Sequence, residues 1–245
     1  YSQKYYTYDD LPDGVAADAA LEHFSIGTGE PGAPDATRDM KNVVPVLQEI
    51  VSINPAVKIM ASPWSAPAWM KTFNRIDGSG RLRIGEYVGN GYRYQDTIDY
   101  VYAQYFVKFI EAYAKLGIHI TSVTMQNEPS NGCPWPITVW TPEELTKWGS
   151  EYLRPALDRA FPDVEIYFGD DSLRFWQRPV SEYMTPAQAQ CFAGAAFHTY
   201  SGLPTWVHNG TRQFPQWKSA MTERRCMLDE TVDEASHVMF GEIGN

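Results

Sequence analysis

The stretch ITSVTMQNEPSNG, residues 120–132, decides which fold this sequence can form. Its apolar, β-branched start predicts a strand, and an amide, a carboxylate and a proline follow at Asn127, Glu128 and Pro129. Because Pro129 lacks a backbone donor, it ends strand pairing and leaves Glu128 at the carboxyl end of the strand. Barrel enzymes carry their catalytic groups at such ends. The alternative is a solvated glutamate in a turn, since turn-forming residues crowd after it.

Helix and strand patterns alternate on both sides of this stretch. Apolar residues at helical spacing predict helices over 36–51, 97–117 and 141–160, and further helices are predicted over 178–190 and about 230–241. Short runs between turn signals predict strands over 57–62, 120–125, 164–169, 194–200 and 218–223, and the first three of these runs are rich in Val and Ile. Thr141, Pro142 and Glu144 are typical of a capped helix start, and Gly117 is typical of a helix end. A loop is predicted over 74–91, and a short helical or loop piece over 204–214.

This alternation is typical of an α/β domain with parallel strands. The sequence has no GxGxxG or GxxxxGK[ST] turn, which argues against a nucleotide-binding doubly wound sheet and favours a (β/α)8 TIM barrel. Eight strands usually need about 250 residues, yet only five strands are predicted in 245 residues. With no internal repeat and no linker, residues 1–245 are predicted to form one incomplete TIM-barrel domain.

Composition and charge narrow the class of partner. The formal net charge of −10 disfavours nucleic acid and anionic membrane surfaces, so a neutral substrate is expected. Three cysteines, far apart, form neither a disulfide framework nor a zinc signature. The apolar runs are far shorter than the roughly 20 residues of a transmembrane helix. No metal or cofactor motif is present, and none of these groups is expected.

Side chains suited to chemistry collect at the predicted strand ends, which meet at one mouth in a barrel. They are Ser62, Trp64, Asn127, Glu128, Asp170, Asp171, His198, Tyr200, Thr222 and Glu223. Two glutamates among amides and aromatic rings favour acid and base chemistry on an uncharged substrate. Cleavage of a glycosidic bond needs an acid, a second carboxylate and aromatic faces that stack on a sugar ring. The absence of a GxSxG elbow argues against acyl transfer.

Two segments, ASPWSAPAWMKT at 61–72 and TMQNEPSNG at 124–132, resemble glycoside hydrolase family 30, the glucosylceramidase family. Further matching segments occur in the order that the family shows: YTYDD at 6–10, HFSI at 23–26, AQYFVKFIEAYAKLGI at 103–118, FGDD at 168–171, FHTY at 197–200 and MTE at 221–223. The resemblance therefore spans essentially the whole chain.

The resemblance implies roles for individual residues. It implies that Glu128 is the general acid/base at the end of the fourth barrel strand and that Glu223 is the nucleophile at the end of the seventh. The substrate-binding residues that it implies are Trp64, Asn127, His198 and Tyr200, with Asn127 holding the 2-hydroxyl of the sugar. Two assignments stay open: Asp170 and Asp171 could cap a helix or touch substrate, and Trp69 could be a core aromatic.

The implied activity is that of a retaining β-glycosidase that works by double displacement on a carbohydrate or glycolipid, as in glucosylceramidases. An endo-β-1,6-glucanase of the same family is the first alternative. A carbohydrate-binding, catalytically degenerate protein is the second, and the charged run Arg224-Arg225-Cys226 after the implied nucleophile favours it. By the same resemblance, the protein is expected to be secreted or lysosomal.

The resemblance also implies which part of the barrel the chain covers. The chain would begin just after the aspartate that ends the family's second strand and end inside the seventh helix. The flanking barrel strands and the family's β-sandwich domain would then lie outside residues 1–245. Because a partial barrel leaves strand edges unpaired and core side chains exposed, we expect poor stability and little catalysis from this chain alone.

Overall fold

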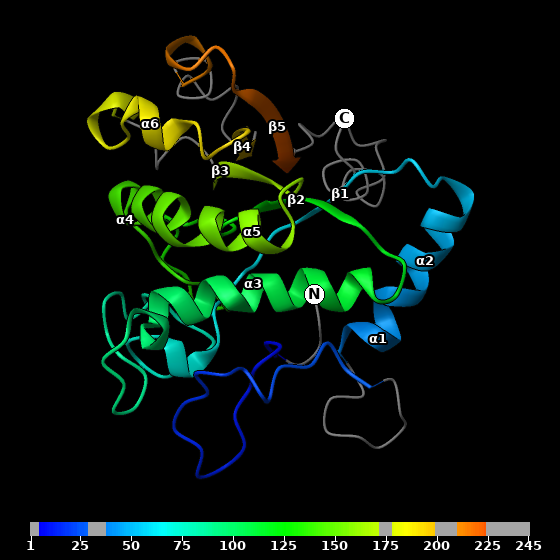
Figure 1. The fold of residues 1–245 in the computed structure, drawn as a ribbon, viewed down its shortest axis with the longest axis vertical. Coiled ribbons are helices and arrows are strands. Elements are labelled where there is room, and N and C mark those ends of the chain that lie inside the picture. The colour runs from blue at the N-terminus through cyan, green and yellow to red at the C-terminus, as the bar shows by residue number, and fades with distance from the viewer. Residues whose placement is uncertain (1–4, 29–37, 172–177, 199–209, 224–245) are drawn as a thin grey trace.

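A single parallel sheet forms the centre of the computed structural model, which describes residues 5–28, 38–171, 178–198 and 210–223. Its strands are β1 (Ile59–Ala61), β2 (Ile120–Thr124), β3 (Glu165–Asp171), β4 (Gly194–His198) and β5 (Lys218–Glu223). They pair in the order β1-β2-β3-β4-β5, and every pair is parallel (Figure 1). Spatial order thus follows chain order, as in a (β/α) barrel, whereas a doubly wound sheet reverses direction partway. The five predicted strands and the incomplete TIM barrel are confirmed.

Helices connect the strands and cover one face of the sheet. They are α1 (Asp39–Asn42), α2 (Val44–Ile53), α3 (Ile98–Ala114), α4 (Pro142–Trp148), α5 (Arg154–Ala160) and α6 (Pro186–Ala189). A π-helical turn, Gly149–Leu153, joins α4 to α5, and short 3₁₀ turns lie at Ala68–Met70, Tyr94–Asp96 and Val180–Glu182. Figure 1 shows α3, α4 and α5 stacked beside the sheet. Within the described residues, no helix has the length and apolar character needed to cross a membrane.

The helix ends largely follow the predicted signals. At the start of α4, the Thr141 hydroxyl accepts from the Glu144 N–H at 3.2 Å, and the Glu144 carboxylate accepts from the Thr141 N–H at 2.9 Å. This is the predicted capping box, which satisfies two donors that the helix itself leaves free. After α3, Gly117 has φ +77°, a conformation that glycine adopts without steric cost.

Two helix predictions were too long. The predicted helix over 36–51 is divided at Val43, and Pro45 lies in the first turn of α2, where its missing N–H is tolerated. The predicted helix over 178–190 consists of the 3₁₀ turn and α6, because Thr185 caps a new start ahead of Pro186. The predicted helix over 230–241 and most of the piece over 204–214 lie outside the described residues.

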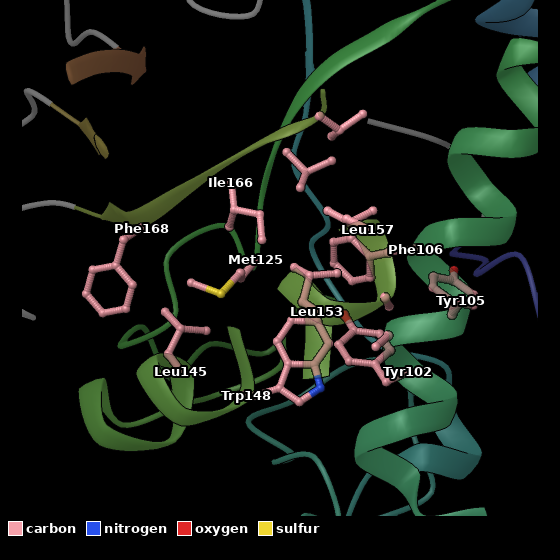
Figure 2. Packing of buried hydrophobic residues seen from close by; sticks show 14 of the residues in the cluster. Tyr102, Tyr105, Phe106, Met125, Leu145, Trp148, Leu153, Leu157, Ile166 and Phe168 are labelled. Atoms are coloured by element: carbon pink, nitrogen blue, oxygen red, sulfur yellow. The ribbon is translucent and has the colours of Figure 1, made fainter. Parts of the chain in front are cut away.

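An aromatic core fills the space between the sheet and the helices (Figure 2). Trp148 of α4 is 1% exposed, and its ring centroid lies 5.0 Å from that of Tyr102 in α3. Its indole N–H donates to the Asp99 carbonyl at 3.0 Å, so the largest core side chain leaves no polar atom unsatisfied. The helices pack on this outer face, and the strand ends carry the polar residues described next.

Candidate active site

Three side chains from neighbouring strands form a row of carboxylate, imidazole and carboxylate. His198 ends β4, Asp170 lies in β3, and Glu128 follows β2. The His198 Nδ1 atom lies 3.3 Å from Glu128 Oε1, and its Nε2 atom lies 3.1 Å from Asp170 Oδ1. His198 is 0% exposed, so water does not compete for these contacts. As predicted, His198 lies at the end of its strand and Glu128 lies in the segment that follows the end of β2.

Asp170 is the polar centre of the described strand ends. The Ser62 and Thr124 hydroxyls lie 2.5 and 2.7 Å from its Oδ2 atom, and the Thr222 hydroxyl lies 2.5 Å from Oδ1. Burial alone would raise the pKa of Asp170, but hydrogen bonds from His198, Ser62 and Thr222, together with the histidine charge, hold the pKa below its ordinary value. Asp170 is therefore a buried, ionised carboxylate.

Glu128 is held at both oxygens and through its backbone. Besides the His198 contact at Oε1, the Asn131 amide donates to Oε2 at 2.7 Å. The hydrogen bond to His198 is the main cause that lowers the pKa of Glu128; burial opposes it and the Asn131 amide reinforces it. The side chain is 14% exposed, which leaves it accessible to a ligand in the mouth.

Both carboxylates of the row have a strained backbone, as do Leu21 and Asn74 elsewhere. Glu128 has φ +46° and Asp170 has φ +71°, values that side-chain-bearing residues rarely adopt. The Glu128 N–H donates to the Asp170 carbonyl at 2.8 Å, which links the two strained residues. Such strain persists where the surrounding contacts fix it, and functional sites are a common location for it.

Asn127 presents a buried amide donor next to Glu128. Its residue is 3% exposed, and its Nδ2 atom has no partner among the described residues. The backbone is fixed because the Asn127 N–H donates to the Pro63 carbonyl at 2.9 Å. A buried donor without a partner is costly to leave unpaired, so it is available to a ligand hydroxyl.

Trp64 lies in the loop after β1, and the loop after β2 holds its backbone in place. Its carbonyl accepts from the Gln126 side-chain amide at 2.6 Å and from the Thr138 N–H at 3.2 Å. The side chain is partly exposed. These contacts join the loop of Trp64 to the segment that carries Asn127 and Glu128.

Other predicted residues have different outcomes. Glu223 ends β5 and pairs in register with His198, which puts its backbone at the same sheet edge, but its side chain lies outside the described part of the structure. Tyr200 also lies outside it.

Trp69 is a core aromatic, 5% exposed, whose Nε1 donates to the buried Asp9 at 3.0 Å. Asp171 accepts from the Ser130 N–H and hydroxyl at 3.0 and 2.6 Å, so it fixes the loop after Glu128.

Sequence reasoning missed Thr124 and Asn131, which donate to Asp170 and Glu128, and Ser130, which donates to Asp171. Thr124 follows Ser122 at a spacing of two in β2, and both are buried. This pair of buried small polar residues on one face of β2 was the available signal for Thr124. Among the described residues, no group of three or more His, Cys, Asp or Glu side chains is arranged to hold a metal ion.

Comparison with known proteins identifies the family. The profile of the glycosyl hydrolase family 30 TIM-barrel domain matches residues 1–237. The chain belongs to glycosyl hydrolase family 30. In this family it is 32% identical to the endo-1,6-β-D-glucanase neg1 of Aspergillus fumigatus over 98% of the chain and 47% of that protein. It is 31% identical to the lysosomal acid glucosylceramidase of Mus musculus over 82% of the chain and 36% of that protein.

Solved structures agree with the family assignment. A crystal structure of SrfJ from Salmonella typhimurium matches with a TM-score of 0.72 and 26% identity over 97% of the chain and 50% of that protein. A solved endo-β1,6-glucanase matches with a TM-score of 0.73 and 27% identity over 91% of the chain and 45% of that protein. The chain spans about half the length of these structures, and less than half the length of the two curated family 30 relatives.

Proposed function

We propose that the protein hydrolyses β-glucosidic bonds with retention of configuration, with Glu128 as the general acid/base and Glu223 as the nucleophile. The observation that carries the proposal is the Glu128–His198–Asp170 row at the carboxyl ends of adjacent parallel strands. Active sites of barrel enzymes lie at this end of the sheet. The register of Glu223 beside His198 supports its assignment as the second carboxylate.

The proposed reaction has two steps. In the first, a Glu223 carboxylate oxygen forms a bond to the anomeric carbon, the glycosidic C–O bond breaks, and Glu128 donates its proton to the departing oxygen. In the second, Glu128 takes a proton from water, whose oxygen attacks the anomeric carbon and releases the Glu223 carboxylate. For this mechanism the two carboxyl groups are expected to lie roughly 5 to 5.5 Å apart.

Asn127 fits the role of holding the sugar 2-hydroxyl. Its buried Nδ2 donor is unpaired among the described residues and adjoins Glu128 in sequence. Hydrogen bonds to the 2-hydroxyl strengthen in the transition state of glycoside hydrolysis. Trp64, in the adjoining loop, supplies a partly exposed aromatic face for the ring.

The substrate proposed first is a glucosylceramide-type β-glucoside, as the sequence resemblance implies. A second candidate is a β-1,6-linked glucan, and it is favoured by the match to a fungal endo-1,6-β-D-glucanase, which extends over 98% of the chain. Incubation of the full-length protein with glucosylceramide and with a β-1,6-glucan separates the two. Free glucose from the lipid supports the first candidate, and oligosaccharides from the glucan support the second.

The stereochemistry of hydrolysis tests the mechanism. Proton NMR of the first-formed sugar should show the β-anomer, because two inversions at one carbon restore the configuration. With Glu223→Ala and added azide, the product should be the α-glycosyl azide, since azide takes the place of the missing carboxylate. With Glu128→Ala and azide, it should be the β-glycosyl azide. An α-anomer from the unaltered protein would contradict the retaining mechanism, and absence of turnover together with sugar binding would support a degenerate protein.

A further inference from the structure

The row of Glu128, His198 and Asp170 needs two protons to satisfy its two contacts. Carboxylate oxygens and unprotonated ring nitrogens are all acceptors, so each contact must contain a hydrogen. If Glu128 is ionised, His198 must be an imidazolium that donates from both nitrogens. If Glu128 is protonated, it donates to Nδ1, and a neutral His198 donates from Nε2 to Asp170. Both states contain the same number of protons.

Asp170 decides which ring nitrogen carries hydrogen. Ser62 and Thr222 hydroxyls lie 2.5 Å from its two oxygens, and Thr124 lies 2.7 Å from Oδ2. The hydroxyls of Ser62, Thr124 and Thr222 can each donate to an ionised Asp170. If Asp170 were protonated, these hydroxyls would no longer have a charged carboxylate as their acceptor. His198 Nε2, at 3.1 Å from Oδ1, is therefore the donor in its contact, which leaves Nδ1 facing Glu128.

We propose that Asp170 is a positioning residue for the acid/base step: it fixes the Nε2–H form of His198 and keeps one exchangeable proton on the contact between His198 Nδ1 and Glu128 Oε1. This inference rests on the proposed function of Glu128. The pKa of Glu128 is lowered, so Glu128 alone would hold its proton weakly. The His198 imidazolium supplies the proton for the departing oxygen to Glu128 across the 3.3 Å contact between Nδ1 and Oε1. His198 takes the proton back when Glu128 deprotonates water.

Within the described part of the chain, charged and titratable groups face the row from the neighbouring strands and loops. His198 meets Glu128 from the loop after β2 and Asp170 from β3. The negative charge of Asp170 acts to raise the pKa of Glu128, and the charge of Glu128 acts to raise the pKa of the Cys133 thiol. From the loop after β1 and from β5, the described side chains that reach Asp170 are the neutral hydroxyls of Ser62 and Thr222. Glu223 is the register partner of His198, and its side chain lies outside the described part of the structure.

Removal of the Asp170 charge should shift the pH profile. A neighbouring anion raises the pKa of an imidazolium, so Asp170→Asn lowers it and lets the exchangeable proton leave at lower pH. We expect the alkaline limb of kcat/KM to move down by about one pH unit or more. For a substrate with a poor leaving group, kcat should fall by about 10-fold or more while KM changes little, because the loss lies in proton transfer. For an activated aryl glucoside, kcat should fall much less.

A structural role alone would give a different result. Asp39→Asn is the matched control, because Asp39 is also a buried carboxylate, 3% exposed, that accepts from Tyr6, Tyr8 and Tyr113 away from the row. This control should lower Tm and leave the alkaline limb in place. If Asp170→Asn lowers Tm to the same degree and also leaves the limb in place, Asp170 is structural and the inference is overturned.

A measurement on the unaltered protein keeps the inference testable if Asp170→Asn does not fold. Nitrogen-15 NMR of labelled histidine reports which ring nitrogen is protonated. Nε2 of His198 should keep its hydrogen for about two pH units on either side of the ordinary histidine pKa of about 6.5. An unprotonated Nε2 in the folded protein within this range would overturn the inference.

Failure of the proposed function is recognised separately. If Glu128→Gln loses activity equally for good and poor leaving groups, the acid/base assignment itself is wrong. If Glu128→Gln behaves as an acid/base variant but Asp170→Asn moves neither the pH limb nor the His198 spectrum, only the role of Asp170 is wrong.

Discussion

The Lys71 ammonium donates to the backbone carbonyl of Ile137 at 2.7 Å, which joins the loop after β1 to the loop after β2. Lys71 is 1% exposed and also donates to the Ser65 hydroxyl at 2.9 Å and the Ile76 carbonyl at 2.8 Å. These two loops carry Trp64 and Glu128. A single buried cation thus links the loop that carries Trp64 to the loop that carries Glu128.

Replacement of Lys71 should destabilise the protein and disturb the site. Lys71→Met leaves the buried Ile137 carbonyl without this donor, at a cost of about 1–3 kcal/mol, whereas the Ile76 carbonyl still accepts from the Ser65 hydroxyl at 2.9 Å. We expect a lower free energy of unfolding in urea and a lower kcat/KM. Arg75→Ala is the control, since the exposed Arg75–Asp77 pair should contribute little. Equal stability of both variants would contradict the bridging role.

The stability difference between the wild type and Lys71→Met should depend on pH. Burial lowers the pKa of Lys71 to about 8, whereas an unfolded lysine has a pKa of about 10.4. Between these values the unfolded chain binds more protons than the folded one, so the lysine contributes increasing stability as pH rises from about 8 towards 10. Urea denaturation of both proteins across this range measures the change. A stability difference between the two proteins that stays constant with pH would contradict the lowered pKa of Lys71.

Asp9 should have the opposite pH dependence. Burial, followed by the charge of Asp18, raises the pKa of Asp9 to about 6, above the unfolded value of about 3.9. The folded chain then binds the extra proton between pH 4 and 6, so stability from this group is lost as pH rises through that range. Thermal unfolding should show wild-type Tm falling relative to Asp9→Asn between pH 4 and 7. A parallel change in both proteins would argue against the raised pKa.

The acid/base role of Glu128 predicts a dependence on the leaving group. In the full-length protein, Glu128→Gln should slow hydrolysis of glucosides with poor leaving groups by about 100-fold or more, while glycosylation by activated aryl glucosides should persist. Pre-steady-state kinetics should then reveal a burst of released phenol, because only the second, base-assisted step remains slow. The matched control is Glu144→Gln, which changes a carboxylate in the helix cap of α4 and should retain the wild-type dependence.

The Asn127 Nδ2 donor, which has no partner within the described ranges, predicts an energetic coupling with the sugar 2-hydroxyl. Asn127→Ala should lower kcat/KM for the β-glucoside, and the 2-deoxy substrate should lower it for the wild type. If Nδ2 donates to this hydroxyl, the two losses overlap, and Asn127→Ala should act on the 2-deoxy substrate almost as well as the wild type does. Additive losses would place the 2-hydroxyl elsewhere.

Much of the fold could be predicted because its signals are local. Short runs between turn signals predicted all five strands, and the capping box at Thr141 and Glu144 predicted the start of α4. Helix lengths were less accurate, since Pro45 and Pro186 each allow a new helix to start inside a continuous apolar pattern. Apolar spacing alone does not separate one long helix from two short ones.

The candidate site was only partly predictable for a physical reason. Asn127, Glu128 and His198 stand at strand ends, so the strand prediction located them. The hydrogen bonds that fix them depend on side-chain direction and on register shifts between Gly169 and Asp171 and between Phe197 and His198. These irregularities turn Asp170 towards His198, and no residue pattern along one strand encodes its neighbour's register.

The π-helical turn between α4 and α5 has a consequence for the strand that leads to Glu128. A Cβ atom on Gly149, the first residue of this turn, would come within 2.5 Å of Met125 Sδ and 2.7 Å of the Phe192 ring. The helix therefore rests against Met125, three residues before Glu128, at a point where only a hydrogen atom fits. A side chain added at Gly149, on the outer layer of the fold, would have to displace Met125 or Phe192, so a replacement on the helix should alter the segment that leads to Glu128.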